Sequence, residues 1–246
     1  MTAIQSHNQL PAAGVTGKRF LPRLKSRIRN GLLVQDIVDV LARAGIVICP
    51  YFVAGEPLPD AQSLALPPHM VVKRLGVADA AEITRITLRP SSSAELVKAL
   101  QLYYCVGLFV EGELAAYTWA STLYVPVPDA GGTPLFPLEP DEAYLFDMYV
   151  APRHRGTRLA ALLRQSIQRQ LASLGRQRFY SISMVFNRSS RRFKARMGSR
   201  ELELRLYLQL RWGTLPGIDI RLRRLQDTLR SPGRTRVAAT SVTRRD

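Results

Sequence analysis

The sequence has little cysteine: Cys49 and Cys105 are the only two among its 246 residues. They lie far apart in apolar surroundings and fit neither the spacing of a zinc site nor that of a redox pair. A disulfide framework of the kind that small secreted proteins need is therefore excluded, and a chain of this length can bury an apolar core without cross-links. We expect two buried thiols in a reducing cytoplasm, and no metal site.

Long apolar runs are missing as well. The most apolar segment, residues 45–55, is far shorter than the roughly 20 residues that a membrane-spanning helix requires. The basic cluster at residues 18–29 is followed by a segment that Asp36 and Asp39 interrupt, which is unlike a secretory signal. These absences predict a cytoplasmic protein.

Acidic residues are scarce at both ends of the chain. Residues 1–35 hold six Lys or Arg and no acid, and residues 188–246 hold sixteen Lys or Arg against five acids, so the ends account for the formal net charge of +16. Such ends attract an anionic partner: a membrane surface, a nucleic acid or an acyl-carrier protein. The alternative is a solvated, arginine-rich surface without a partner.

The hydrophobic pattern divides the chain into four parts. We expect a disordered N-terminus over 1–19, a helix–strand extension and linker over 20–68, a folded domain over 69–212 and a basic tail over 213–246. Within them, apolar residues recur at helical spacing or alternate as in strands. The predicted helices cover 20–44, 78–88, 93–102, 156–174, 189–197 and 220–229, and the predicted strands cover 46–53, 70–75, 105–110, 113–121, 144–150, 178–186 and 201–212, with a loop over 126–140.

A basic turn between a strand and a helix is the most informative segment. The strand ends at Val150, and Arg153, Arg155 and Arg158 crowd the start of the following helix around Gly156. A helix N-terminus offers free N–H groups and a positive dipole end, and a glycine lets a ligand approach the backbone closely. The turn therefore predicts a phosphate or pyrophosphate site. It lacks the Gly-Lys-Ser/Thr ending of a Walker loop and the three glycines of the dinucleotide fingerprint.

This turn resembles the acyl-CoA signature of the GNAT acyltransferase superfamily. The matching residues read Val150-x-Pro152-x-x-Arg155-Gly156-x-x-Leu159-Ala160, with Arg158 where the family has a glycine or alanine. A second segment, Asn187-x-x-Ser190-x-x-Phe193 followed by Met197-Gly198, resembles the family's next motif at the right distance. The resemblance covers about residues 69–212.

The resemblance implies an α/β (α+β) fold: a mixed, mostly antiparallel sheet with helices on both faces, splayed between its fourth and fifth strands. Those strands are 144–150 and 178–186 here. It also implies acetyl-CoA or another acyl-CoA as co-substrate. The residues that the resemblance assigns to acyl-CoA binding are Met148 and Val150 for the pantetheine arm, Arg153, Arg155, Gly156, Thr157, Arg158 and Leu159 for the pyrophosphate, and Asn187, Ser190 and Phe193 beside them.

The reaction implied is direct attack of an amine, from a small molecule or a protein, on the thioester. An alkylammonium must first lose a proton, so a base is needed near neutrality. Asp147 is the candidate base, or it caps or orients its neighbours. Lys194 stands where the family often has a general-acid tyrosine, so the acid is Tyr149, Tyr180 or a water. The alternative function is a catalytically weak GNAT-like module that binds acyl-CoA or docks on a polyanion.

Overall fold

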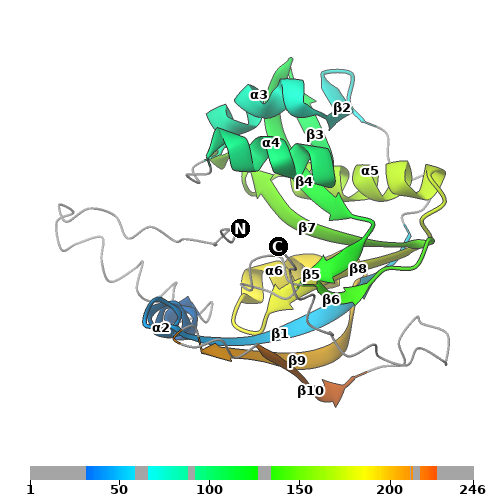
Figure 1. Ribbon diagram of the computed structural model, residues 1–246. Helices are drawn as coiled ribbons and strands as arrows, with labels where there is room; N and C mark the ends of the chain where they lie inside the picture. The colour runs from blue at the N-terminus through cyan, green and yellow to red at the C-terminus, as the bar shows by residue number, and fades with distance from the viewer. Residues whose placement is uncertain are drawn as a thin grey trace, which may run out of the picture.

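The computed structural model of the protein describes residues 32–58, 66–87, 92–126, 134–210, 212 and 217–225 (Figure 1). At its centre is an eight-stranded sheet that is antiparallel throughout except where β7 meets β8. In spatial order the strands are β10 (Ile218–Arg224), β9 (Arg200–Leu210), β1 (Ile46–Glu56), β8 (Arg178–Met184), β7 (Glu142–Val150), β4 (Glu113–Ser121), β3 (Tyr104–Val110) and β2 (Met70–Leu75). The predicted fold class is confirmed.

Helices cover both faces of the sheet, as predicted. One face carries α3 (Ala80–Ile86), which follows a 3-10 turn η2 (Val77–Asp79), and α4 (Ser93–Leu102). Their apolar residues pack with Leu75, Cys105 and Trp119 of the strands. The other face carries α5 (Leu159–Ser173), whose apolar stripe packs on Val106, Leu108 and Phe179.

Local sequence signals explain where these helices begin and end. The Ser92 side chain accepts a hydrogen bond from the Glu95 amide at 3.2 Å, and Glu95 accepts one from the Ser92 amide at 3.3 Å, which is a capping box at the start of α4. Leu159, Leu163, Ile167 and Leu171 of α5 recur every four residues and are buried. α4 has its predicted limits, whereas α5 begins three residues later than predicted and ends one residue earlier.

Strand β1 occupies a central place in the sheet. The sequence predicts this strand but assigns it to an extension that precedes the folded domain. In the structure it lies between β8 and β9 and is antiparallel to both, from Ile46 paired with Leu210 to Glu56 paired with Phe179. The sheet therefore begins before residue 69, because strand pairing joins segments that the intervening chain separates in sequence. α2 (Leu32–Arg43), the second half of the predicted N-terminal helix, leads into β1; its first half lies outside the described residues.

Two predicted elements need correction. A strand, β10, stands over Ile218–Arg224 in place of the predicted helix, and it pairs with β9. Ile218 and Ile220 alternate with charged residues, which is the two-residue period of a strand. Pairing with β9 supplies hydrogen-bond partners for the main chain of this segment. The predicted loop over 126–140 contains a small second sheet formed by β5 (Tyr124–Pro126) and β6 (Pro134–Pro137).

The buried side of β9 also differs from the prediction. The pattern of alternating leucines predicts that they face the core, but only Leu202 is buried, and Arg205 and Tyr207 are the buried residues further along. A register shift opposite Val53 and Ala54 moves the strand to its other face after Leu202. Arg205 forms an ion pair with Asp219, which also accepts a hydrogen bond from the Tyr51 hydroxyl at 2.7 Å.

The parallel strands β7 and β8 separate along the sheet. They pair only from Glu142 with Arg178 to Tyr144 with Tyr180. Beyond that point β7 stays with β4 and β8 stays with β1. The sheet is thus splayed between these two strands, as predicted. Among the described helices none has both the length and the apolar character to cross a membrane.

Candidate active site

The gap between β7 and β8 is bordered by main-chain groups. Successive residues of a strand direct their N–H and C=O groups to opposite edges. The Ala151 amide bonds to the Ala115 carbonyl of β4, so the polar main-chain groups of Val150 and Met148 point away from β4 and into the gap. The Val185 amide bonds to the Pro50 carbonyl of β1. The N–H and C=O groups of Ile182 in β8 therefore point away from β1 and into the gap.

A bulge in β7 lies beside the gap at Asp147. Tyr149 pairs with Tyr117 and Phe146 pairs with Trp119, so two residues of β7 oppose Thr118 alone. Asp147 has a positive φ of 42°, a costly conformation for a residue with a Cβ. Because of the bulge, Met148 packs with the α5 cluster. Burial raises the pKa of the Cys105 thiol, which lies in the core cluster under α3 and α4, and the negative charge of Asp147 raises it further.

Tyr149 lies on the α3–α4 side as well. Its ring stacks on Tyr117 with centroids 5.5 Å apart, and the Arg155 guanidinium lies 5.8 Å from its centroid. The hydroxyl is buried and has no hydrogen-bond partner within the described part of the chain. The other tyrosine named as a candidate acid, Tyr180, donates from its hydroxyl to the Glu142 carboxylate at 3.0 Å.

The basic turn leads from β7 into α5. It contains the 3-10 turn η3 (Pro152–His154) and Gly156 with φ 83°. The Thr157 hydroxyl donates to the His154 carbonyl at 2.6 Å and accepts from the Leu159 amide at 3.4 Å. Residues 155–158 are exposed, and the first amides of α5 have no acceptor inside the helix. The turn therefore offers N–H groups and a positive dipole end to an anion.

The arginines of the turn have different contacts. Arg153 forms an ion pair with Glu113 at the start of β4. Arg155 donates from Nε to the Val150 carbonyl at 3.2 Å, which brings its guanidinium to the edge of the gap. Arg158 is exposed at the N-cap of α5. Arg155 and Arg158 are therefore more accessible to a phosphate than Arg153.

The second motif forms α6 (Arg188–Arg196). The Asn187 side-chain oxygen accepts from the Ser190 amide at 3.0 Å and caps the helix. The Ser190 hydroxyl lies 3.3 Å from that of Ser183 in β8. Phe193 is half-buried. The motif thus fixes α6 on the same face of the sheet as α5.

A buried cluster of charged residues under α5 and α6 escaped the sequence prediction. Arg164 of α5 holds the Glu56 carboxylate of β1 with two bonds of 2.8 and 2.5 Å, and Gln168 adds a third at 3.2 Å. Lys194 of α6 is 9% exposed and donates from Nζ to the Ile182 carbonyl at 2.6 Å. Because that carbonyl faces the gap, the amine lies at the gap. The helical spacing of Arg164 and Gln168 is visible in the sequence, but their partner on β1 is not.

The cluster shifts two ionisation equilibria. Burial lowers the pKa of Lys194 from 10.5 to about 7, against the attraction of Glu56 and Glu201 and with the repulsion of Arg164. Burial opposes the ionisation of Glu56, yet the charge and hydrogen bonds of Arg164, with Lys194, hold its pKa below the usual value. An anion thus stays buried next to an amine that exchanges its proton near neutral pH.

The sequence matches the model of one protein family, and its fold is similar to those of several solved structures. The model of the acetyltransferase (GNAT) family matches residues 78–198. A tandem GNAT protein from the clavulanic acid biosynthesis pathway is 17% identical, with a TM-score of 0.50 over 69% of this chain and 55% of that chain. A GNAT-family protein from Novosphingobium aromaticivorans is 22% identical, with a TM-score of 0.48 over 68% and 66%.

A third structure, an aminoglycoside N-acetyltransferase in complex with CoA, is 19% identical, with a TM-score of 0.43 over 54% of this chain and 91% of that chain. No curated protein matches the sequence at a significant level. The chain spans less than two thirds of the length of the first two structures, and at these identities the likeness concerns the fold. With its family match, its splayed sheet and its basic strand–turn–helix, the chain belongs to the GNAT superfamily of acetyltransferases.

Proposed function

We propose that the protein is an N-acyltransferase that transfers an acetyl group from acetyl-CoA to an amine by direct attack. The observation that supports it most is the gap between β7 and β8, which begins beyond Tyr144 and Tyr180 and opens beside the N-terminus of α5. An extended amide-containing arm can pair with the main chain of Met148 and Val150 there, while a pyrophosphate is held at the first turn of α5.

The turn residues would bind the anionic end of the co-substrate. The amides of Gly156, Thr157 and Arg158 belong to the exposed turn, and Leu159 begins the helix. In this proposal Arg155 exchanges its bond with the Val150 carbonyl for a phosphate oxygen, which frees that carbonyl for the arm. Asn187, Ser190 and Phe193 lie on α6 across the gap and border the same arm.

Two groups would carry the protons. Asp147, held on the α3–α4 side by the bulge, takes the proton of the attacking ammonium. As the nitrogen–acyl bond forms and the carbon–sulfur bond breaks, Lys194 gives a proton to the departing thiolate. We assign this second role to Lys194 rather than Tyr149, because its Nζ lies at the gap whereas the Tyr149 ring stacks on Tyr117. A pKa of about 7 supplies both protonation states near neutrality.

The acceptor in this proposal is an amine of a small molecule or of a protein, and the setting is the cytoplasm. Both cysteines are free and buried, which suits a reducing compartment where acetyl-CoA is made.

A second candidate function is a catalytically weak module that binds acyl-CoA. It is favoured by Arg158 at the family's glycine or alanine position and by Lys194 at the tyrosine position. One measurement tests acyl-CoA binding, which both candidates require, and a second separates the candidates. Acetyl-CoA should raise the melting temperature in both, because it binds only the folded state. Release of CoA with a panel of acyl-CoAs and amines should occur only in the enzyme, and the absence of both effects would refute acyl-CoA binding altogether.

A further inference from the structure

One face of the sheet is apolar at a place where none of the core clusters of the described residues lies over it. Partners in antiparallel strands direct their side chains to the same side. Ile48 pairs with Leu208, which pairs with Ile218, and Pro50 pairs with Leu206, which pairs with Ile220. We call the side chains that share this side the apolar strip: Ile46, Ile48 and Pro50 of β1, Leu206, Leu208 and Leu210 of β9, and Ile218 and Ile220 of β10.

The apolar strip is open to solvent at its outer end. Leu210 is 48% exposed, Ile218 61% and Ile220 41%. An antiparallel sheet with one covered face normally has polar residues on the other. Here the covered face already buries Val47 and Tyr51 in a core cluster. A sheet that is apolar on both sides exposes a patch of the kind that marks an interaction surface.

The strip lies on the same side of the sheet as α6. Phe52 pairs with Ser183, and Ser183 meets Ser190 of α6. Arg191 lies 4.2 Å over the ring of Phe52 and is held by Glu201 at 2.6 and 3.1 Å. The inner end of the strip is therefore continuous with the base of α6.

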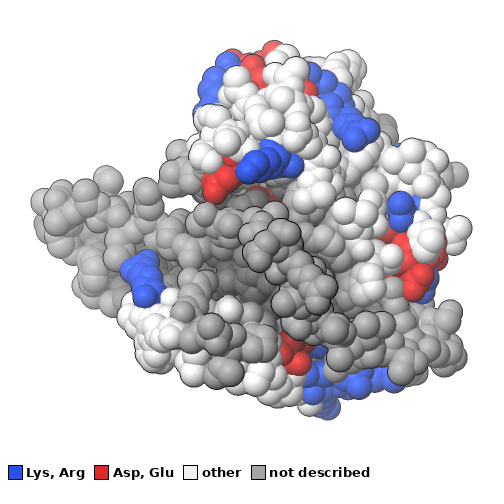
Figure 2. All heavy atoms as spheres, in the orientation of Figure 1, with Lys and Arg blue, Asp and Glu red and all other residues white. Residues whose placement is uncertain are grey.

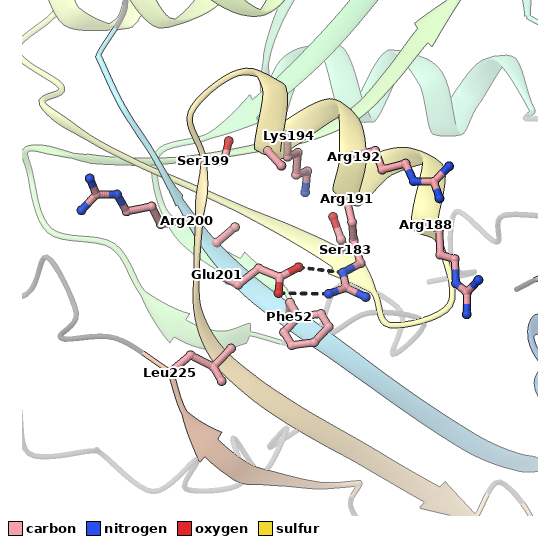
Figure 3. Close-up of a pocket in the computed structure, with 12 residues that line it drawn as sticks. Phe52, Ser183, Arg188, Arg191, Arg192, Lys194, Ser199, Arg200, Glu201 and Leu225 are labelled. Carbon is pink, nitrogen blue, oxygen red and sulfur yellow. Dashed lines mark hydrogen bonds and ion pairs between the residues drawn. The ribbon is translucent and has the colours of Figure 1, made fainter. Parts of the chain in front are cut away.

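Positive charge borders the strip at this end. A cavity of about 700 Å³ beside α6 is lined by Phe52 and Leu225 together with Arg188, Arg192 and Arg200. Figure 3 shows Arg188 and Arg192 projecting outward from α6, whereas Arg191 turns inward to Glu201. Figure 2 shows further basic side chains at the lower end of the molecule, where Figure 1 draws β10. Arg223 of β10 pairs with Leu204 and so belongs to the same side.

The shape and charge of this surface indicate which kind of partner it can bind. Three adjacent strands form an open face that cannot enclose a small ligand. A second copy of the chain would bring arginines against arginines, in a protein whose net charge is +16. An interface with an apolar interior and anionic phosphates at its surface complements both the strip and the arginines.

We propose that the apolar strip and the arginines beside it form a docking surface for an anionic phospholipid bilayer. Ile218, Ile220 and Leu210 enter the boundary of the acyl chains, and Arg192 and Arg223 contact phosphate groups. The surface belongs to the folded sheet and to α6. Vesicle binding is measured without acyl-CoA or an amine, so this proposal is tested separately from the acyltransferase reaction.

The test is sedimentation of the full chain with vesicles of phosphatidylcholine, with and without phosphatidylglycerol. Binding should require phosphatidylglycerol and weaken as salt screens the arginines over a Debye length of about 8 Å at physiological ionic strength. The double variant Ile218→Ser/Ile220→Ser should bind roughly tenfold more weakly, equal to about 1.4 kcal/mol. Val71→Ser is the matched control, because Val71 is 58% exposed on β2 at the opposite edge of the sheet.

The charge contribution is tested by Arg192→Glu/Arg223→Glu, which should abolish binding to vesicles that contain phosphatidylglycerol. Arg85→Glu, an exposed arginine of α3, is its control and should bind as the wild type does. Circular dichroism checks that each variant is folded. Equal binding by the strip variant and its control would overturn the proposal. So would binding to acyl-carrier protein or nucleic acid in place of vesicles, which would assign the surface to an acidic macromolecule.

Discussion

Replacing Lys194 with methionine should change how the stability of the protein depends on pH. The amine is 9% exposed, and burial lowers its pKa to about 7. In the unfolded chain the same group titrates near ~10.4. Between these values the unfolded state binds a proton that the folded state does not, so the free energy of unfolding rises with pH across this window.

The size of the effect follows from the two pKa values. One pH unit inside the window contributes at most about 1.4 kcal/mol. Between pH 7 and pH 9 the wild-type protein should therefore gain roughly 2 kcal/mol of stability that Lys194→Met does not gain. Methionine has a similar length and is apolar, so the variant removes the titrating group while keeping most of the packing.

Urea unfolding of both proteins at pH 7, 8 and 9, at constant ionic strength, measures this difference. Other titrating groups contribute equally to both proteins and cancel in the comparison. Parallel stability curves would mean that the amine keeps its proton while buried, which would refute both the lowered pKa and its use as an acid near neutrality. A titration of Lys194 followed by NMR at its side-chain carbons measures the pKa independently.

Three further predictions concern the site and the sheet. Arg155→Ala should weaken acetyl-CoA binding by roughly tenfold to a hundredfold, the loss of one charge-assisted contact of about 1.5–3 kcal/mol, while an analogue without the pyrophosphate should be little affected in calorimetry. Asp147→Asn should lower turnover by about 10²–10⁴-fold and leave acetyl-CoA affinity nearly unchanged, whereas unchanged turnover would make Asp147 a structural residue. A chain that begins at residue 69 lacks β1 and should no longer unfold cooperatively in urea. The reason is that β8 and β9 lose the strand that lies between them, and Arg164 loses its partner Glu56. If the shortened chain unfolds as the wild type does, β1 is not a central strand of the sheet.

Features that depend on neighbouring residues were predictable from the sequence. The capping box at Ser92 and Glu95, the stripe of α5 and the turn around Gly156 follow from contacts a few residues apart, so their residue types reveal them. The same holds for the basic strand–turn–helix and for the motif at Asn187, which identified the superfamily. The order of the main elements and the segment that carries the candidate site could therefore be predicted before the structure was known.

Contacts between residues that are distant in the sequence were not predictable and depend on the tertiary structure. It inserted β1 between β8 and β9, which brought Glu56 to Arg164 across 108 positions of the chain. The fold also buries Lys194, although a lysine side chain is ordinarily solvated. Burial lowers the pKa of its amine toward neutrality. The tertiary structure also turned the leucines of β9 toward solvent through a single register shift. These outcomes depend on pairing and burial between remote segments, which periodicity does not encode, because any strand of suitable pattern satisfies the hydrogen bonds of its neighbour equally well.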